Sequence, residues 1–196
     1  MTVALTMDRA AFFNQVRGPL FRGRIDFGQT LGIEAKLDEF EKRKLTDLRW
    51  LAYMLATSYH ETGKRMRPVR EGFAISDSSA RRIVAERAYG KPDPRTGQVY
   101  YGRGEVQLTW YKNYEEMGRL LDLPLTENPD LALKADVSAA IMFDGMILGL
   151  FTGKKLADFF NGDRADWVNA REIINRLDRA ELIAGYAKTF HAALNT

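Results

Sequence analysis

Two glutamates, Glu61 and Glu71, are the residues of this sequence best suited to acid–base chemistry, and they stand ten positions apart. Cleavage of a glycosidic bond needs one protonated carboxyl group that donates to the leaving oxygen and a second carboxylate that is ionised. The second carboxylate activates a water molecule or attacks the sugar, and a separation of about 6.5–9.5 Å between the two groups gives inversion. Gly63 and Pro68 tighten the connection between the glutamates. The pair therefore suits glycoside hydrolysis, with Glu61 and Glu71 as candidate catalytic residues.

Four basic residues between the two glutamates bear on this prediction: Lys64, Arg65, Arg67 and Arg70. Nearby positive charge favours the ionised form of a carboxylate, whereas a general acid must hold its proton. We therefore expect these four side chains to point toward solvent or an anionic substrate, with Glu61 against apolar neighbours. The alternative is that Glu61 is a solvent-exposed residue at a helix end with no catalytic role.

The segment 100–110, Tyr-Tyr-Gly-Arg-Gly-Glu-Val-Gln-Leu-Thr-Trp, gathers residues that suit sugar binding. Its two glycines let the backbone approach a ligand closely. In an extended strand Gln107 and Thr109 share one face and offer an amide beside a hydroxyl, with Glu105 as a spare carboxylate on that face. The tyrosines and Trp110 would supply flat apolar faces for sugar rings. The alternative is a hairpin whose aromatic residues belong to the core.

Several other kinds of site are excluded by the residues present. The sequence has no cysteine, which excludes disulfides, thiolate metal sites and a cysteine nucleophile. A zinc-protease helix that began at His60 would need histidine at position 64, where Lys64 stands. Gln107 occupies the third glycine position of a dinucleotide-binding loop. Neither a Gly-x-Ser-x-Gly elbow nor a phosphate-binding Walker loop is present.

Helices are the main elements that must position these residues. The clearest helix has apolar or small residues at 48, 51, 52, 55, 56 and 59, which form one stripe. Thr46 suits its N-cap and Gly63 suits the left-handed position after its end, so Glu61 lies in its last turn. Other helices are predicted near 12–16, 31–40, 113–121, 136–150, 163–176 and 178–194.

Two details complete the predicted architecture. Asp178 and Glu181 have capping-box spacing at the start of the last helix, and the charged run 41–44 is interpreted as a solvated helix end. The β-forming residues and glycines of segment 98–110 predict a hairpin. The sequence therefore predicts a mainly α domain with one small β-hairpin element.

Composition and charge narrow the classes of protein further. The 196 residues are interpreted as a single catalytic domain, 1–196, with 1–44 as a helical segment packed on it. The net charge of +3 and a sequence pI near 9.1 suit an anionic polymer but do not indicate nucleic acid. We expect no secretory signal at the start of the chain. The apolar stretch 137–150 is interrupted by Asp144 and too short to span a bilayer, so no stable membrane insertion is expected.

Several segments together resemble the family-19 glycoside hydrolases, chitinase-like enzymes that include many phage endolysins. The segment 59–63, Tyr-His-Glu-Thr-Gly, resembles the His-Glu-Thr motif that carries the catalytic acid of that family. The segment 100–109 closely resembles its Tyr-Tyr-Gly-Arg-Gly-x-x-Gln-Leu-Ser/Thr signature. Segments 111–114, 128–132 and 173–175 continue the similarity, which runs from about Leu48 to the C-terminus.

The resemblance implies a lysozyme-like, two-lobed helical fold and an inverting mechanism without metal or organic cofactor. It implies Glu61 as the acid, Glu71 as the base and Thr109 as a holder of the attacking water. Sugar binding would fall to Gln107 and Asn175, although Arg176 stands after Asn175 where the family has glycine. Further substrate-binding candidates from the same motifs are His60, Tyr101, Arg103, Trp110 and Asn113. The short distance along the chain between acid and base is similar to that in phage-type members.

The preferred prediction is an endolysin of the muramidase type that cleaves the β-1,4 bond between N-acetylmuramic acid and N-acetylglucosamine. Its partner would be the glycan strands of peptidoglycan, and we expect a monomer that does not bind nucleic acid. It would be made in the host cytoplasm and reach the cell wall after release. The alternatives are a chitinase and, in another class, a glycan-binding module without catalysis.

Overall fold

The computed structural model describes residues 7–196, and the helices and strands below belong to that part of the chain. The α-helices are α1 (Arg9–Phe21), α2 (Phe27–Lys42), α3 (Leu48–Glu61), α4 (Asp77–Val84), α5 (Tyr111–Leu121), α6 (Ala135–Leu148), α7 (Leu156–Phe159) and α8 (Ala180–Leu194). The short strands are β1 (Val69–Arg70), β2 (Arg103–Gly104), β3 (Phe160–Asn161) and β4 (Arg164–Ala165). The 3-10 helices are η1 (Glu71–Phe73), η2 (Ala88–Gly90), η3 (Pro129–Leu133) and η4 (Asn169–Ile173).

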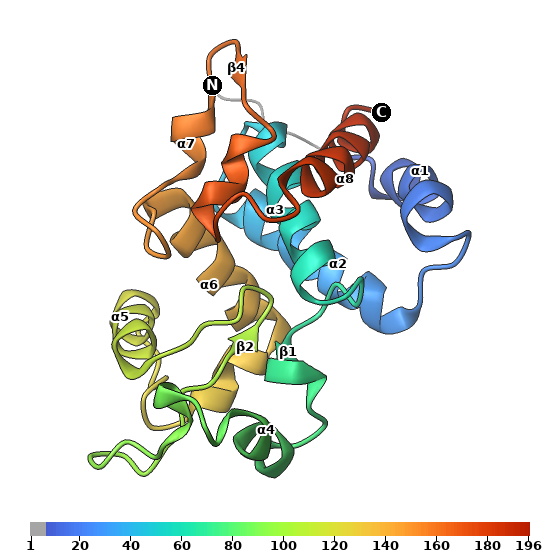
Figure 1. Ribbon diagram of the computed structural model, residues 1–196. Helices are drawn as coiled ribbons and strands as arrows, with labels where there is room; N and C mark the ends of the chain where they lie inside the picture. Colours follow the sequence, from blue (N-terminus) through green and yellow to red (C-terminus); the bar gives the residue numbers. More distant parts are fainter. Residues whose placement is uncertain (1–6) are drawn as a thin grey trace.

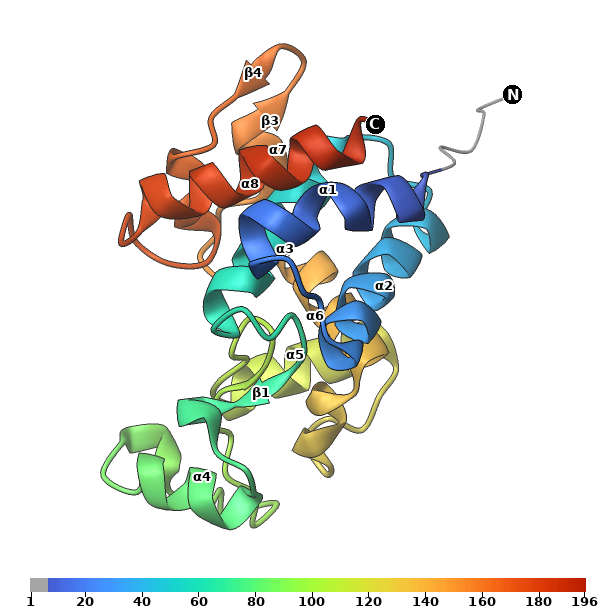
Figure 2. The same ribbon diagram turned by 90° about the vertical axis from the view of Figure 1, so that its right-hand side faces the viewer.

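The elements form two lobes of unequal size (Figures 1 and 2). The larger lobe holds α1, α2, α3, α7 and α8, and the smaller lobe holds α4, α5 and the β1–β2 pair (Figure 1). Helix α6 runs from the smaller lobe into the larger one and packs against both α2 and α5. The predicted mainly α fold with two lobes is confirmed.

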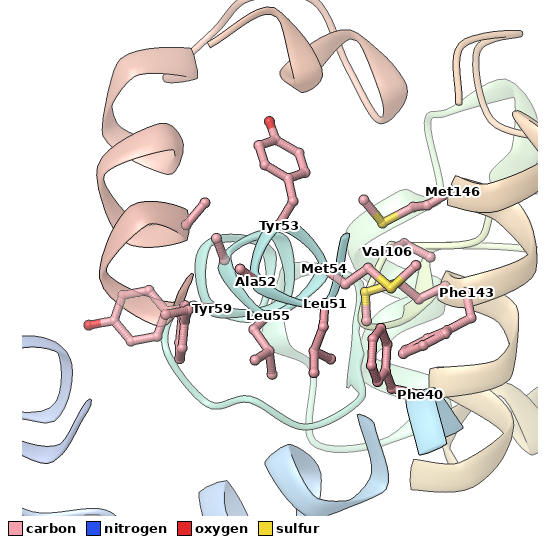
Figure 3. Close-up of a cluster of buried hydrophobic side chains, with 14 of the residues drawn as sticks. Phe40, Leu51, Ala52, Tyr53, Met54, Leu55, Tyr59, Val106, Phe143 and Met146 are labelled. Carbon is pink, nitrogen blue, oxygen red and sulfur yellow. The ribbon is translucent and has the colours of Figure 1, made fainter. Parts of the chain in front are cut away.

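Helix α3 is the centre of the larger lobe. Every residue from Leu51 to Tyr59 is buried, and α8 covers one side of the helix while α2 and α6 lie on the other. Figure 3 shows the buried side chains of α3 pointing outward in several directions, with Phe40, Phe143 and Met146 packed on one side. The predicted single apolar stripe was therefore too narrow, because a helix surrounded by neighbours buries all of its faces.

The N-terminal helices pack on this core. Helix α1 lies on α8 and α2 lies on α6. Arg9 of α1 forms ion pairs with Glu34, Asp38 and Glu41 of α2. These contacts attach the region 9–42 to the larger lobe.

Helix boundaries differ from the prediction where other residues than expected cap a helix or form ion pairs at its end. Asp47, and not Thr46, caps α3 by accepting from the backbone N–H of Arg49. Helix α8 begins after Arg179, whose backbone is left-handed, so Asp178 does not cap it. In the charged run 41–44, Arg43 turns inward to Asp144 of α6, with Nη1–Oδ1 at 2.5 Å. The predicted solvated helix end is therefore wrong for Arg43.

The predicted helix over 163–176 is also wrong. Residues 160–165 form the β3–β4 hairpin, and only the short helix η4 follows. Gly162 has a φ of +54°, a conformation that closes the tight turn of the hairpin at little cost for glycine. The side chain of Asp166 then accepts from the backbone N–H of Asn169, which separates the hairpin from η4.

The predicted hairpin in 98–110 is shorter than expected, and its one strand pairs with a distant segment. Strand β2 pairs antiparallel with β1, Val69 opposite Gly104. Within segment 98–110 itself, Arg103 and Leu108 form an isolated antiparallel bridge, and the backbone N–H of Trp110 donates to the carbonyl of Tyr100 at 2.9 Å. Gln107 has a φ of +53°, so it is not in an extended strand, and the predicted shared face with Thr109 does not form. The described residues thus contain two small sheets, one in each lobe.

A buried ion pair joins α2 to the turn after β2. Lys36 Nζ lies 2.7 and 2.5 Å from the two carboxylate oxygens of Glu105 and 3.0 Å from the carbonyl oxygen of Met66. Both side chains are 0% exposed. Burial raises the pKa of the Glu105 carboxyl and lowers that of the Lys36 ammonium, while the partner's charge acts in the opposite direction on each. Glu105 is therefore a structural residue, and its predicted role as a spare catalytic carboxylate is wrong.

Candidate active site

Glu61 is the last residue of α3, and its side chain is 21% exposed. Its Oε1 accepts a hydrogen bond of 2.7 Å from Nη1 of Arg171, a buried residue of η4. Gly63 follows with a φ of +56°, as predicted, and lets the chain leave the helix at once. The carboxylate thus stands at the end of a rigid, buried helix and remains open to solvent on one side.

The four basic residues after Glu61 do not pair with it. Lys64 lies over the ring of Tyr59, and Arg65 lies over the ring of Phe73. Arg70 pairs with Asp130, Nη2 to Oδ2 at 2.6 Å. The cation beside Glu61 is instead Arg171, which is 110 positions away in the chain, so the predicted apolar surroundings of this carboxylate are wrong.

Glu71 directly follows β1 and is held by two donors. The hydroxyl of Tyr89 donates to Oε1 at 2.6 Å, and the backbone N–H of Gly102 donates to Oε2 at 2.8 Å. The backbone N–H of Glu71 in turn donates to the carbonyl of Gly102 at 2.7 Å. Desolvation raises the pKa of Tyr89 to about 12, so its hydroxyl keeps its proton at neutral pH. The side chain of Glu71 is 18% exposed and has a fixed orientation.

Gly102 also brings Gln107 next to Glu71. A Cβ at position 102 would lie 2.7 Å from Oε1 of Gln107, so a larger residue here would require the Gln107 side chain to move. The amide nitrogen of Gln107 donates to the carbonyls of Val69 and Gly104, at 3.2 and 3.1 Å. Both N–H groups of this amide are thus used by the backbone, and its oxygen is the atom left to accept from a ligand.

Thr109 and Asn113 form a second polar pair at the start of α5. The hydroxyl of Thr109 donates to the carbonyl of Gln107 at 2.8 Å, and Nδ2 of Asn113 donates to the carbonyl of Thr109 at 2.7 Å. Both side chains are half-buried. Their remaining acceptor atoms, the threonine hydroxyl oxygen and Oδ1 of Asn113, stay available to a water molecule or a sugar hydroxyl.

Trp110 is 50% exposed and has a φ of +74°, an uncommon conformation for a residue with a side chain. Its ring meets that of Tyr89 edge to face, with 5.2 Å between centroids. Both rings line a hollow of about 230 Å³ together with Pro92, Tyr100 and Tyr111. Because Tyr89 also donates to Glu71, this aromatic wall is directly connected to the second carboxylate.

The family model described as Chitinase class I, of glycoside hydrolase family 19, matches residues 43–155, more than half of the chain. This chain belongs to glycoside hydrolase family 19. The matched range includes Glu61, Glu71 and the whole segment 100–110. It ends before Arg171 and Asn175, so the region around η4 lies outside it.

Several proteins of known name are similar to this family-19 chain. An endochitinase of Arabidopsis thaliana is 34% identical over 91 residues, which cover 46% of this chain and 29% of that protein. The inactive chitinase-like protein 1 of Hevea brasiliensis is 43% identical over 63 residues, 29% of this chain and 20% of that protein. The matched regions thus span less than a third of the length of these relatives.

Solved structures give a likeness over most of the chain. A bacterial family 19 chitinase has a TM-score of 0.45 at 23% identity, covering 91% of this chain and 95% of that one. Chitinase C from Streptomyces griseus has a TM-score of 0.46 at 21% identity, covering 91% of this chain and 92% of that one.

Two of the predicted substrate-binding residues of the family-19 signature are not at the surface. Tyr101 and Arg103 are buried in the smaller lobe, where the guanidinium lies over the tyrosine ring. Arg103 Nε binds Asp130 at 2.7 Å, and the hydroxyl of Tyr101 donates to Asp77 at 2.9 Å. Their predicted contact with sugar is therefore wrong. They hold together the lobe that carries Glu71.

His60 and Asn175 are each close in the chain to one member of the Glu61–Arg171 pair. His60 is half-buried, and burial lowers the pKa of its imidazole, so the ring is neutral at pH 7. Asn175 is exposed, and its backbone N–H donates to the carbonyl of Arg171 at 3.0 Å. It lines a hollow of about 410 Å³ with Thr152 and other neighbours. Sugar binding by both residues stays a prediction.

Sequence reasoning missed two residues of this site, Arg171 and Tyr89. Each contacts a carboxylate far away in the chain, Arg171 with Glu61 and Tyr89 with Glu71. Arg171 lies in the region that was assigned to a long helix, and no pattern marked its side chain as buried. Tyr89 follows a run of exposed residues and precedes the loop 90–97, so nothing in the sequence near it indicated a partner.

Two further observations concern metal binding and membrane-spanning helices. Among residues 7–196, no group of three or more histidine and carboxylate side chains is arranged to hold a metal ion. In the same part of the chain, no helix is both long and apolar enough to cross a bilayer.

Proposed function

We propose that this protein hydrolyses the glycan of bacterial peptidoglycan at the β-1,4 bond between N-acetylmuramic acid and N-acetylglucosamine. The supporting observation is the contrast between Glu61 and Glu71, two part-exposed carboxylates with different surroundings. One oxygen of Glu61 is bound by Arg171, and within the described residues the other makes no hydrogen bond. Both oxygens of Glu71 are bound. One carboxyl is thus free to transfer a proton, and the other is fixed in orientation.

In the proposed mechanism Glu61 protonates the leaving glycosidic oxygen while Glu71 removes a proton from the attacking water. Arg171 stabilises the carboxylate that remains on Glu61 after transfer. The hydroxyl of Thr109 helps to hold the water, and Gln107, Asn113 and Asn175 accept or donate hydrogen bonds to sugar groups. Attack from the side opposite the leaving group inverts the anomeric carbon.

The choice of peptidoglycan over chitin rests on charge. The chain carries a net charge of +3, and three basic side chains between the two glutamates, Lys64, Arg65 and Arg67, are exposed. Peptidoglycan is anionic, whereas chitin is neutral, so a cationic surround favours the former. Chitin hydrolysis is the second candidate because most of the named relatives are endochitinases.

The deciding experiment is mass spectrometry of soluble products from purified sacculi, with chitin as a parallel substrate. Disaccharide-peptides with a muramic-acid reducing end are the expected products from sacculi. Chito-oligosaccharides together with intact sacculi would replace the proposal by a chitinase. Absence of products from both substrates, with retained binding to one of them, would support a glycan-binding module. One similar protein, from Hevea brasiliensis, is named as inactive.

We further propose that the protein is a monomeric phage or prophage endolysin that is made in the cytoplasm and acts on the wall after release. Expression in a bacterial host should cause lysis only when the inner membrane is permeabilised. Lysis without permeabilisation would contradict this route.

Replacement of Tyr89 by phenylalanine is expected to lower kcat about 10-fold with little change in KM. Hydrogen bonds to a charged group contribute about 1.5–3 kcal/mol, and this one orients the proposed base. Both constants can be measured from the release of reducing ends. Tyr186→Phe is the control, because Tyr186 is a partly buried tyrosine of α8 that packs against Tyr59, outside the aromatic hollow. Equal losses in the two variants would remove the positioning role of Tyr89.

A further inference from the structure

A hollow of about 400 Å³ lies along the segment that joins the two proposed catalytic glutamates. Its walls combine cationic and apolar side chains. The main ones are Arg65, Arg67, Arg70, Phe73, Ile75 and Leu133. All but Leu133 come from the chain between Glu61 and the start of α4, so the hollow is built from the same short segment that carries Glu71.

The three arginines of the hollow differ in whether their guanidinium groups already form an ion pair. Arg70 is bound to Asp130. Arg65 lies over the ring of Phe73, 4.2 Å from the centroid, and its Nη1 is 3.3 Å from the carbonyl oxygen of Thr62. Within residues 7–196, neither Arg65 nor Arg67 has a carboxylate within ion-pair distance, and both are exposed. Their two positive charges are therefore free to bind an anion.

Helix α2 continues the surface beyond the hollow. The Lys64 carbonyl accepts from the Gln29 side chain at 3.0 Å, which holds the loop against the start of α2 (Figure 2). Nη1 of Arg67 lies 2.5 Å from where a Cβ of Gly28 would be, so its guanidinium rests on this glycine. Phe27 next to it is 78% exposed. The nearby carboxylate of Asp26 caps α2 and makes no ion pair with Arg65 or Arg67.

Exposed apolar side chains complete the surface. Ile75 is 95% exposed and Phe73 is 46% exposed, both on the rim of the hollow. A neutral sugar has no carboxylate for the two guanidinium groups, which bind carboxylates best, whereas the exposed isoleucine and phenylalanine can bury methyl groups. The ligand that fits is therefore a small-residue peptide with several carboxylates.

We propose that this hollow binds the acidic peptide stem of peptidoglycan through Arg65 and Arg67, an inference that rests on the proposed function. Each muramic acid of the glycan carries such a stem, with alanine methyl groups and free carboxylates, whereas chitin carries none. A strand cut between Glu61 and Glu71 has its stems close to the segment that links these two residues. Stem binding then selects peptidoglycan over chitin without any change at the catalytic carboxylates.

The test uses soluble, uncrosslinked glycan strands in two forms, with intact stems and after removal of the stems by an amidase. The double variant Arg65→Gln/Arg67→Gln is expected to have a roughly 5- to 10-fold higher KM on stem-bearing strands, since exposed charge contacts are individually weak. Its kcat, and its kcat/KM on stem-free strands, should stay within about twofold of wild type. The wild-type preference for stem-bearing strands should decrease as salt is raised.

The matched control is Arg82→Gln/Arg119→Gln, which removes the same charge from exposed positions on α4 and α5. It should leave both KM values unchanged. Equal losses on the two kinds of strand, or wild-type behaviour of the Arg65/Arg67 variant on both, would overturn the inference and leave the proposed function standing. If the wild type cleaves neither kind of strand, the proposed function itself fails.

Discussion

Replacement of Glu61 by glutamine is expected to lower the turnover of the glycan by about 10²- to 10⁴-fold, the usual effect of losing a general acid. The amide keeps an oxygen that accepts from Arg171, so the local geometry is preserved, but it has no proton to transfer to the leaving oxygen. The rate of reducing-end release, measured at saturating substrate, gives the effect on kcat. The thermal unfolding midpoint should stay within a few degrees of wild type.

Glu181→Gln is the control for this variant, because Glu181 is an exposed carboxylate near the start of α8. It should retain full activity. A folded Glu61→Gln protein with wild-type turnover would exclude Glu61 as the acid. In that case Glu71 would have to be tested in the same way before any catalytic role is kept for this pair.

Replacement of Lys36 by methionine is expected to cost about 3–5 kcal/mol in the free energy of unfolding, because it leaves the charge of Glu105 buried without a partner. For a domain of this size that corresponds to a decrease of roughly 6–20 °C in the unfolding midpoint. Methionine keeps much of the volume of the lysine stem, so the loss reports the charge rather than a cavity. The ammonium also donates to the carbonyl of Met66, which loses its donor. Calorimetry or circular dichroism measures the change.

Two further variants distinguish the loss of the buried Lys36–Glu105 ion pair from the general effect of replacing a lysine. Lys36→Met/Glu105→Met removes both charges and should recover most of the lost stability, because no unpaired charge remains. Lys42→Met breaks the pair with Glu39 in which the lysine is 77% exposed, and it should shift the midpoint by no more than about 2 °C. If Lys36→Met unfolds within about 3 °C of wild type, the pair is not a stabilising link between α2 and the turn after β2.

The sequence by itself determined the features that depend on residues close together in the chain. The apolar pattern of 48–59 identified α3, and Gly63 marked the left-handed residue after its end. Glu61 therefore had to lie in the last turn of a buried helix. The motifs around Glu61 and in 100–110 indicated the family for the same reason, because each motif is a continuous stretch of chain.

Only the tertiary structure decided which residues meet across long stretches of chain. Arg171 reaches Glu61 over 110 positions and Lys36 reaches Glu105 over 69, and no local pattern distinguishes these partners from other charged residues. Strand β2 pairs with the distant β1, and Tyr101 and Arg103 are buried in the lobe that this pairing helps to form. The physical reason is that helix periodicity and capping depend on backbone geometry, which residues a few positions apart in the sequence determine. Burial and ion pairing depend on the packing of the two lobes, which the whole chain determines at once.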